Sequence, residues 1–125
     1  MTFGKRPSSV TKILVTHHPF ARSDEKHAGD VVRNGCWVLK QLEGLDIDLL
    51  LGGHLHKAYH AHMKHRMISL QAGTAISRRH RGEPNSYNWL TVSYPKIDLE
   101  VRVYDGREFS ASLSQSWNRR NLDIN

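Results

Sequence analysis

A short apolar run, followed at once by two glycines and two histidines, constrains this chain more than any other feature. Leu49–Leu51 is apolar, Gly52 and Gly53 end the run, and His54 and His56 come next. A short unbroken apolar segment bounded by glycine is typical of a strand that is covered on both faces. If the chain stays extended past this strand, residues i and i+2 point to one side, and the two imidazoles are presented together as metal ligands.

Strand signals on both sides of an amphipathic segment predict a βαβ unit. We expect a buried strand over 10–16, a helix over 30–43 and a second buried strand over 47–51. A strand, a helix and a strand in this order form a parallel pair joined by a right-handed crossover. His17 directly follows the first strand, as His54 follows the second. Because parallel strands place their carboxyl ends at one edge of a sheet, we expect these histidines to converge there.

Four residues of the predicted helix carry specific expectations. Asp30 is placed to be the N-cap, and Gly44 to end the helix in a left-handed conformation. Gly35 would allow close packing of the helix on a sheet. Cys36 is the single cysteine, and we expect it to be a small buried residue and not a nucleophile.

The remainder of the chain alternates in the manner of antiparallel strands. We expect a linker over 1–9, the βαβ unit over 10–56, antiparallel strands over 57–117 and a polar tail over 118–125. Within the third part, short strands are predicted over 58–62 and 67–71, and a meander with one wet face over 87–94, 99–104 and 109–117. In the last strand we expect Phe109, Ala111, Leu113 and Trp117 to share one face, with serines on the other.

Composition restricts the partners and the compartment. The chain has 125 residues, enough for one domain, and a formal net charge of +6, which favours an anionic partner such as a phosphate ester or a nucleic acid. A solubilising surface charge explains the same number. One cysteine excludes an internal disulfide, and neither a membrane span nor a signal peptide is recognisable. We therefore expect a cytoplasmic protein without a membrane partner.

The histidines and arginines also have a plainer interpretation. A lone His-x-His is commonly a pair of surface or hydrogen-bonded histidines, although the preceding glycines and His17 favour a metal site. The other histidines are expected to be solvated; they are His27, His60, His62, His65 and His80. Arg78, Arg79 and Arg81 fit a solvated loop, or a contact with phosphate, which guanidinium groups bind in a bidentate manner.

Two motifs carry a resemblance to a known family. The segments Leu14–Pro19 and Leu51–His56 resemble the last two metal-binding motifs of the calcineurin-like metallophosphoesterases. Segments 71–79 and 82–88 resemble the stretch that follows these motifs in bacterial members, so that the match covers about residues 10 to 104.

The resemblance implies a fold, a cofactor and a reaction. The fold is α/β, a sandwich of two mixed sheets flanked by helices in αββα order. Members bind two divalent metals, commonly manganese, iron or zinc, and hydrolyse phosphodiesters or phosphomonoesters with a metal-activated hydroxide. By this resemblance His17 and His54 bind the second metal and His56 the first, while His18 has a supporting role. Arg78 and Arg79 are the corresponding candidates for substrate binding.

The resemblance covers only part of the family pattern. The upstream Asp-x-His, Gly-Asp-x-x-Asp and Gly-Asn-His motifs, which supply the bridging carboxylate, an asparagine ligand and the histidine that assists the leaving group, do not occur in this sequence. Three histidines alone do not hold two cations about 4 Å apart. We therefore expect the carboxyl-terminal half of such an enzyme, incomplete in this chain, whose catalytic residues lie elsewhere.

Two other functions stay open on the sequence. The chain fits a non-catalytic metal-binding or interaction module that complements a separate amino-terminal half, or associates with itself through an exposed sheet edge. It also fits a small basic nucleic-acid-binding domain, although it lacks a basic helix and interleaved aromatic and basic residues.

Overall fold

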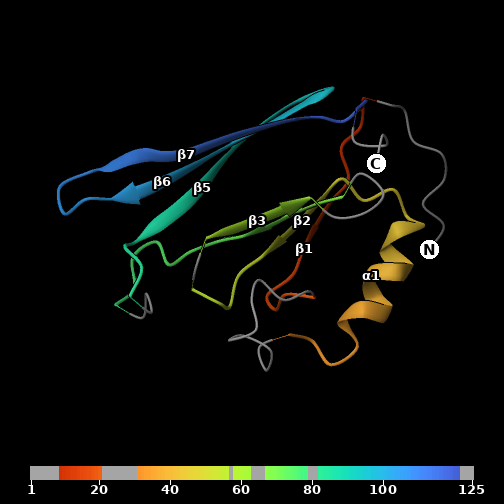
Figure 1. The fold of residues 1–125 in the computed structure, drawn as a ribbon, viewed down its shortest axis with the longest axis horizontal. Coiled ribbons are helices and arrows are strands. Elements are labelled where there is room, and N and C mark those ends of the chain that lie inside the picture. Colours follow the sequence, from red (N-terminus) through yellow and green to blue (C-terminus); the bar gives the residue numbers. More distant parts are fainter. Residues whose placement is uncertain (1–8, 21–30, 57, 63–66, 79–81, 122–125) are drawn as a thin grey trace.

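The computed structural model describes residues 9–20, 31–56, 58–62, 67–78 and 82–121. These residues form one helix and seven strands, in two sheets (Figure 1). In chain order the elements are β1 (Ile13–Val15), α1 (Gly35–Glu43), β2 (Leu49–Gly52), β3 (Tyr59–His62), β4 (Ile68–Gln71), β5 (Ser86–Ser93), β6 (Lys96–Tyr104) and β7 (Phe109–Asn118). No helix in the described ranges is long and apolar enough to cross a membrane.

The first sheet, sheet A, is mixed and has the strand order β1-β2-β4-β3. β1 pairs parallel with β2, with Ile13 opposite Leu49, and β2 pairs parallel with β4, with Leu49 opposite Ile68. β3 joins β4 in the antiparallel direction. The predicted parallel pair of the βαβ unit is therefore confirmed, and the carboxyl ends of β1, β2 and β4 lie at one edge of sheet A.

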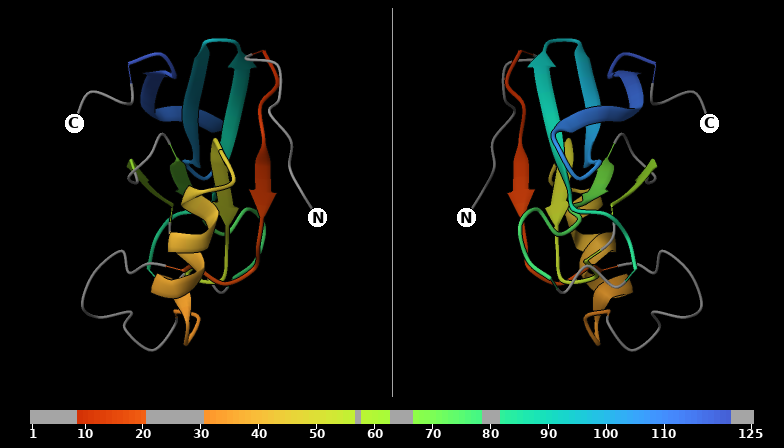
Figure 2. Two further views of the ribbon diagram at one scale, coloured as in Figure 1. Left: turned by 90° about the vertical axis from the view of Figure 1, so that its right-hand side faces the viewer. Right: turned by 90° about the vertical axis from the view of Figure 1, so that its left-hand side faces the viewer.

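The second sheet, sheet B, is the antiparallel meander β5-β6-β7, as the alternating sequence predicts. Sheet B packs over sheet A, while α1 covers the opposite face of sheet A (Figures 1 and 2). The α/β class is confirmed, with one mixed and one antiparallel sheet where the resemblance implies two mixed sheets. In the described part of the chain no helix covers the outer face of sheet B, so the layers present are α, β and β.

Two apolar clusters hold the three layers together by burying side chains on both faces of sheet A. The cluster between the sheets contains Leu49, Ile68, Leu70, Ile97, Leu99, Val101 and Trp117. The cluster beneath α1 contains Leu42, Ile47, Leu50 and Met67, with Leu14, Phe20, Val38, Leu39 and Leu45 packed against it. β2 contributes to both clusters, because Leu49 and Leu50 point to opposite faces. This confirms that the leucine run is a strand covered on both sides.

β1 is shorter and less buried than its sequence predicts. It covers Ile13–Val15 instead of 10–16, and Ile13 and Val15 are 48% and 71% exposed. Leu14, on the other face, packs against the cluster beneath α1. β1 is an edge strand of sheet A, and described residues leave its face on the sheet B side uncovered. The expectation of a buried strand is therefore wrong for that face.

α1 begins later and ends differently than predicted. It starts at Gly35, with Asn34 as its N-cap residue, whereas Asp30 lies outside the described residues. Gly35 is closely approached by the segment after β1, because a Cβ there would collide with the backbone carbonyl of Phe20. Gly44 ends the helix, but with a right-handed φ of −77°, and the left-handed residue is Asp46 at φ 52°. The left-handed prediction for Gly44 is therefore wrong.

Two burial expectations near α1 are also wrong. Cys36 is exposed. The side of α1 that is buried against sheet A carries Val38, Leu39 and Leu42, and Cys36 is not part of it. Phe20 packs against that side of α1, although the charged and irregular sequence of residues 20–29 predicts a surface loop. The rest of the predicted loop, residues 21–29, lies outside the described residues.

The predicted alternation of β7 is interrupted by a bulge. β7 pairs with β6 so that Val101 lies opposite Leu113 but Arg102 lies opposite Ala111. Ser112 is the additional residue, and an additional residue moves the following side chains to the other face of a strand. Phe109 and Ala111 therefore lie on the outer face of sheet B, while Trp117 is buried in the core.

The predicted polar tail contains a buried ion pair. Arg119 Nη2 lies 2.8 Å from Asp48 Oδ1, and both side chains are almost fully buried. Asp48 also accepts a hydrogen bond from the backbone N–H of Lys12 at 2.7 Å. Arg119 donates to Thr11 Oγ1 at 2.9 Å. These contacts fix the segment before β1 to the segments before β2 and after β7.

Candidate metal centre

The parallel ladder between β1 and β2 continues past both strands and fixes the backbone of the histidine motifs. The N–H of Thr16 donates to the carbonyl of Leu51 at 2.8 Å. The N–H of Gly53 then donates to the carbonyl of His17 at 3.1 Å. His17 and His54 thus follow two strand ends that are hydrogen bonded to each other. Their proximity follows from the sheet and does not depend on a long loop.

Three imidazoles meet at this edge. The rings of His17 and His54 are 5.2 Å apart between centroids, and those of His17 and His18 are 4.7 Å apart. His18 and His54 are closest, at 4.2 Å. One ring nitrogen from each residue lies within 4.8 Å of the others. His17 and His18 are exposed and His54 is half-buried, so the cluster is open to solvent.

The turn after β2 is wound, not extended. His54 and His56 have left-handed φ angles of 69° and 58°, which few residues other than glycine adopt. Between them Leu55 is buried, and its N–H donates to the carbonyl of Gly53 at 2.8 Å. The expectation of an extended chain at His54–His56 is therefore wrong. Strained backbone of this kind concentrates at functional sites, where the surrounding packing maintains it.

His56 is not part of the three-histidine group and instead contacts the segment that follows β4. Its Nδ1 is hydrogen bonded to Thr74 Oγ1 at 2.8 Å, and Thr74 is buried. The segment that carries Thr74 is fixed on both sides, by the N–H of Ala72 donating to Gly52 and that of Ser86 donating to Thr74. This contact was not predicted from the sequence. β4 is the third parallel strand, so the rule that joined His17 to His54 also points to Thr74.

Position 52, at the end of β2, requires glycine, because the Gln71 side chain occupies the space that a Cβ at this position would fill. Gly52 and Gln71 are opposite each other on β2 and β4. A Cβ on Gly52 would lie 2.5 Å from Gln71 Nε2 and 2.6 Å from Oε1. A Cβ on Gly53 would meet only the His17 carbonyl, at 3.9 Å. The predicted close approach is therefore correct for Gly52 alone.

The arginines and the other histidines that the sequence offers as candidates do not join this cluster in the described part of the chain. Arg78 is exposed in the loop before β5, and Arg79 lies outside the described residues. The other histidines, at 27, 60, 62, 65 and 80, are outside the described residues or have side chains that the structure leaves undescribed.

The donor set fits one metal ion better than two. Three imidazole nitrogens are the ligand type that zinc and similar transition metals accept in proteins. The described residues place no carboxylate in this group, so a pair of metals would need ligands from elsewhere. Magnesium and calcium prefer oxygen ligands and fit this donor set poorly.

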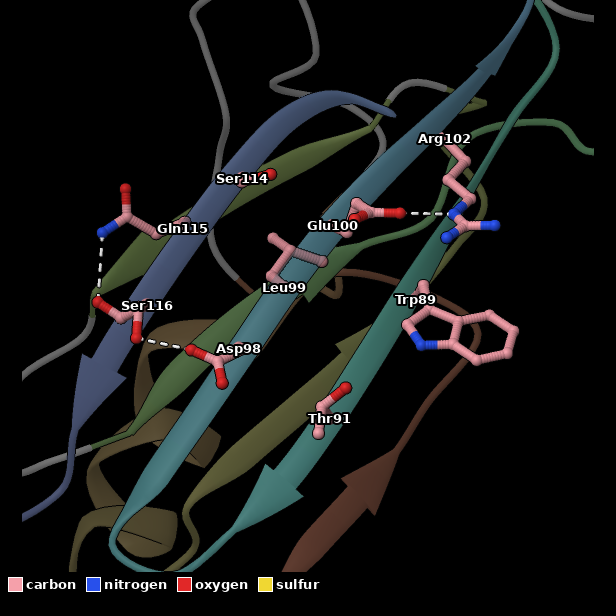
Figure 3. Close-up of a pocket in the computed structure, with 9 residues that line it drawn as sticks. All are labelled: Trp89, Thr91, Asp98, Leu99, Glu100, Arg102, Ser114, Gln115 and Ser116. Carbon is pink, nitrogen blue, oxygen red and sulfur yellow. Dashed lines mark hydrogen bonds and ion pairs between the residues drawn. The ribbon is translucent and has the colours of Figure 1, made fainter. Parts of the chain in front are cut away.

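A separate hollow of about 400 Å³ lies on the outer face of sheet B (Figure 3). Its charged groups have partners: Arg102 forms an ion pair with Glu100, and Asp98 accepts a hydrogen bond from Ser116 Oγ at 2.5 Å. The bond from Ser116, assisted by Lys96, lowers the pKa of Asp98, and Glu100 raises that of Arg102. None of the residues that line the hollow is a histidine or a cysteine. We therefore place the candidate site at the histidine cluster.

Comparison with known proteins adds the fold. No protein-family model matches the sequence, and no curated protein is significantly similar to it. Solved structures do match. Vps29 of Chaetomium thermophilum, complexed with a RaPID-derived cyclic peptide, superposes with a TM-score of 0.57 at 13% identity, over 86% of this chain and 56% of that one. The chain has a Vps29-like fold.

Two further Vps29 structures agree. Vacuolar protein sorting 29 of Cryptosporidium parvum matches with a TM-score of 0.55 at 18% identity, over 75% of this chain and 48% of that one. Vps29 of Entamoeba histolytica complexed with Zn²⁺ matches with a TM-score of 0.53 at 16% identity, over 86% and 54%. The chain therefore spans about half the length of the Vps29 structures that it matches. At these identities the similarity establishes the fold alone.

Proposed function

We propose that this chain is the metal-binding carboxyl-terminal half of a calcineurin-like phosphoesterase domain. The observation that carries the proposal is the meeting of three imidazoles at the carboxyl edge of parallel strands. The Vps29-like fold supports it, because Vps29 belongs to the calcineurin-like superfamily. That a Vps29 structure is complexed with Zn²⁺ supports a divalent metal at this fold.

In the proposed enzyme the histidines divide between two metals. His17 and His54, whose rings are 5.2 Å apart, hold one metal. His56, held by Thr74 at Nδ1, offers its Nε2 to the other. When bound, the metals supply a nucleophilic hydroxide and neutralise charge on the phosphoryl group. The bridging carboxylate and the group assisting the leaving oxygen come from a second segment.

The substrate is a phosphate ester. The net charge of +6 favours an anionic ligand, and Arg78 and Arg79 are proposed to contact its phosphate. The single cysteine supports a reducing, cytoplasmic location as part of the same proposal.

Manganese-dependent hydrolysis of a nitrophenyl phosphodiester tests the proposal. The pure chain alone should hydrolyse the diester no faster than buffer containing manganese. An added segment that supplies the three upstream motifs and binds this chain should produce hydrolysis, and His54→Ala should abolish it. Hydrolysis by the chain alone that is abolished by His54→Ala would show that the site is complete. A bound complex that retains its metals but does not hydrolyse the diester would refute the enzymatic assignment.

A second function is favoured by the uncovered face of β1. Ile13 and Val15 are exposed beside the core between the sheets, an arrangement that fits a missing neighbour. One Vps29 structure is a complex with a cyclic peptide, which supports peptide binding by this fold. On this account the chain is a non-catalytic module that pairs with another polypeptide through the β1 edge.

Size-exclusion chromatography with light scattering tests the second function. A dimer, or a complex with the added segment, that Val15→Lys disrupts would support pairing through β1. Thr91→Lys, at an exposed position of sheet B, is the matched control. A stable, well-folded monomer that also does not bind the added segment would contradict pairing through β1.

A further inference from the structure

We infer that His17, His18 and His54 form a complete three-histidine site for one transition-metal ion within this chain. This inference rests on the part of the proposed function that places a metal at this sheet edge. It goes further in assigning His18 as a ligand and in setting the stoichiometry at one metal. It also removes His56 from the ligand set of this ion.

The distances allow all three rings to reach one ion. The three ring nitrogens lie within 4.8 Å of one another. Around a tetrahedral zinc with nitrogen ligands at about 2.0–2.1 Å, neighbouring nitrogens lie about 3.3 Å apart. Each nitrogen therefore has to approach its neighbours by no more than about 1.5 Å. Rotation of the exposed rings of His17 and His18 supplies a shift of this size without moving the strands.

The backbone around His18 is anchored on both sides. Its carbonyl accepts a hydrogen bond from Thr16 Oγ1 at 3.2 Å, and the next residue, Pro19, is fully buried. The backbone on both sides of His18 is thus fixed while its ring stays exposed. The ring lies closer to that of His54 than the ring of His17 does, at 4.2 Å against 5.2 Å.

His56 takes a different direction. Its Nδ1 is bound to the buried Thr74 Oγ1, and the three-histidine group does not include it. The same turn therefore places the His54 ring in the three-histidine group and the His56 ring against the segment that follows β4. The backbone strain at both residues supports this division, because buried Leu55 between them fixes the turn.

Three imidazoles favour a particular class of metal. Zinc and cobalt accept three nitrogens and keep a fourth position for solvent or an anion, as in open zinc sites. Zinc should therefore bind more tightly than manganese, following the general order of affinity for nitrogen ligands.

Titration of the full chain with Zn²⁺ in a calorimeter tests the inference. We expect one ion per chain, and a loss of affinity of at least about tenfold for each of His17→Ala, His18→Ala and His54→Ala. His56→Ala tests the exclusion of His56 from this site and should leave the affinity for this ion within about twofold. Thr91→Ala, at an exposed position of sheet B, is the matched control and should leave the affinity unchanged. Circular dichroism of each variant checks that it is folded.

Nuclear magnetic resonance of the unaltered chain gives an independent measurement. One equivalent of Zn²⁺ should shift the imidazole ¹⁵N signals of His17, His18 and His54, and leave those of His56 nearly unchanged. Unchanged signals from His18, or full affinity in a folded His18→Ala variant, would overturn the inference. A stoichiometry of two, or an equal loss in His56→Ala, would also overturn it.

These results separate the inference from the proposed function. Zinc binding that needs His17 and His54 but not His18 would refute the three-histidine site and leave the phosphoesterase proposal standing. Zinc binding that needs His17, His18 and His54, without hydrolysis in the assembled complex, would support the three-histidine site and refute the phosphoesterase proposal.

Discussion

Replacing Gly52 with alanine should distort the strand end that carries the histidines. The added Cβ would lie 2.5 Å from Gln71 Nε2, 2.6 Å from Oε1 and 2.9 Å from Cδ. Gln71 is only 3% exposed, so its side chain cannot swing out into solvent. Inserting one methyl group into such a packed position costs about 1–3 kcal/mol, and we expect Gly52→Ala to lower the free energy of unfolding by that amount.

The neighbouring glycine supplies the control. A Cβ on Gly53 meets only the His17 carbonyl, at 3.9 Å, which is an ordinary contact. Gly53→Ala should therefore leave the stability nearly unchanged, or raise it slightly by restricting the unfolded chain. Both variants change the same residue type at adjacent positions, so any difference reports the contact with Gln71.

Urea unfolding followed by circular dichroism measures the effect. The midpoint should fall for Gly52→Ala at an unchanged slope, and the double variant Gly52→Ala/Gln71→Ala should recover part of the loss. The zinc affinity of Gly52→Ala should fall as well, because the turn to His54 begins there. Equal midpoints for the two glycine variants would refute the packing argument.

Two further predictions concern the scaffold. Arg119→Ala leaves the buried Asp48 carboxylate without its 2.8 Å partner and should lower the free energy of unfolding by about 3–5 kcal/mol, measured by urea unfolding; a loss below about 1 kcal/mol would contradict the importance of this pair. At the β6–β7 turn, hydrogen bonds from the backbone N–H groups of Glu108 and Arg107 lower the pKa of Asp105 below 3.8. The stabilisation from Asp105 should therefore be present at neutral pH and be lost as the pH falls through that lowered pKa. The stability difference between the wild type and Asp105→Ala should shrink in acid, and an equal difference at neutral pH and about pH 2 would contradict it.

The fold was predictable where the signals are local. The leucine run at 49–51 and the alternation of the meander each define a strand without reference to distant residues. The parallel pairing of β1 with β2 then followed from chain order. The bulge at Ser112 was not predictable, because the alternating residues continue through it and only the register with β6 shows it.

Burial at the edges was not predictable for a different reason. The apolar residues of β1 have the same sequence pattern in an edge strand as in a covered one, and their exposure depends on which elements are present. In the same way, Arg119 reads as part of a polar tail until the fold brings it to Asp48. Pairings between residues so far apart in the chain leave no trace in either local sequence.

The candidate site was likewise predictable only in part. That His17 and His54 meet followed from the rule for parallel strand ends. The inclusion of His18 did not follow, because it depends on how Thr16 and the buried Pro19 hold the segment after β1. The separation of His56 did not follow either, because it depends on the left-handed turn at His54–His56. Non-glycine residues rarely adopt that conformation, so an extended chain was the natural expectation from sequence.

Anomalous diffraction at the zinc edge tests the central claim most directly. Crystals of the full chain grown with one equivalent of zinc should show a single strong peak, with nitrogens of His17, His18 and His54 about 2.0–2.1 Å away. A strongest peak at other histidines, such as His60, His62 or His65, would contradict the assignment of the metal centre to the ends of β1 and β2. The absence of any zinc at the three-histidine cluster in a zinc-loaded crystal would contradict it equally.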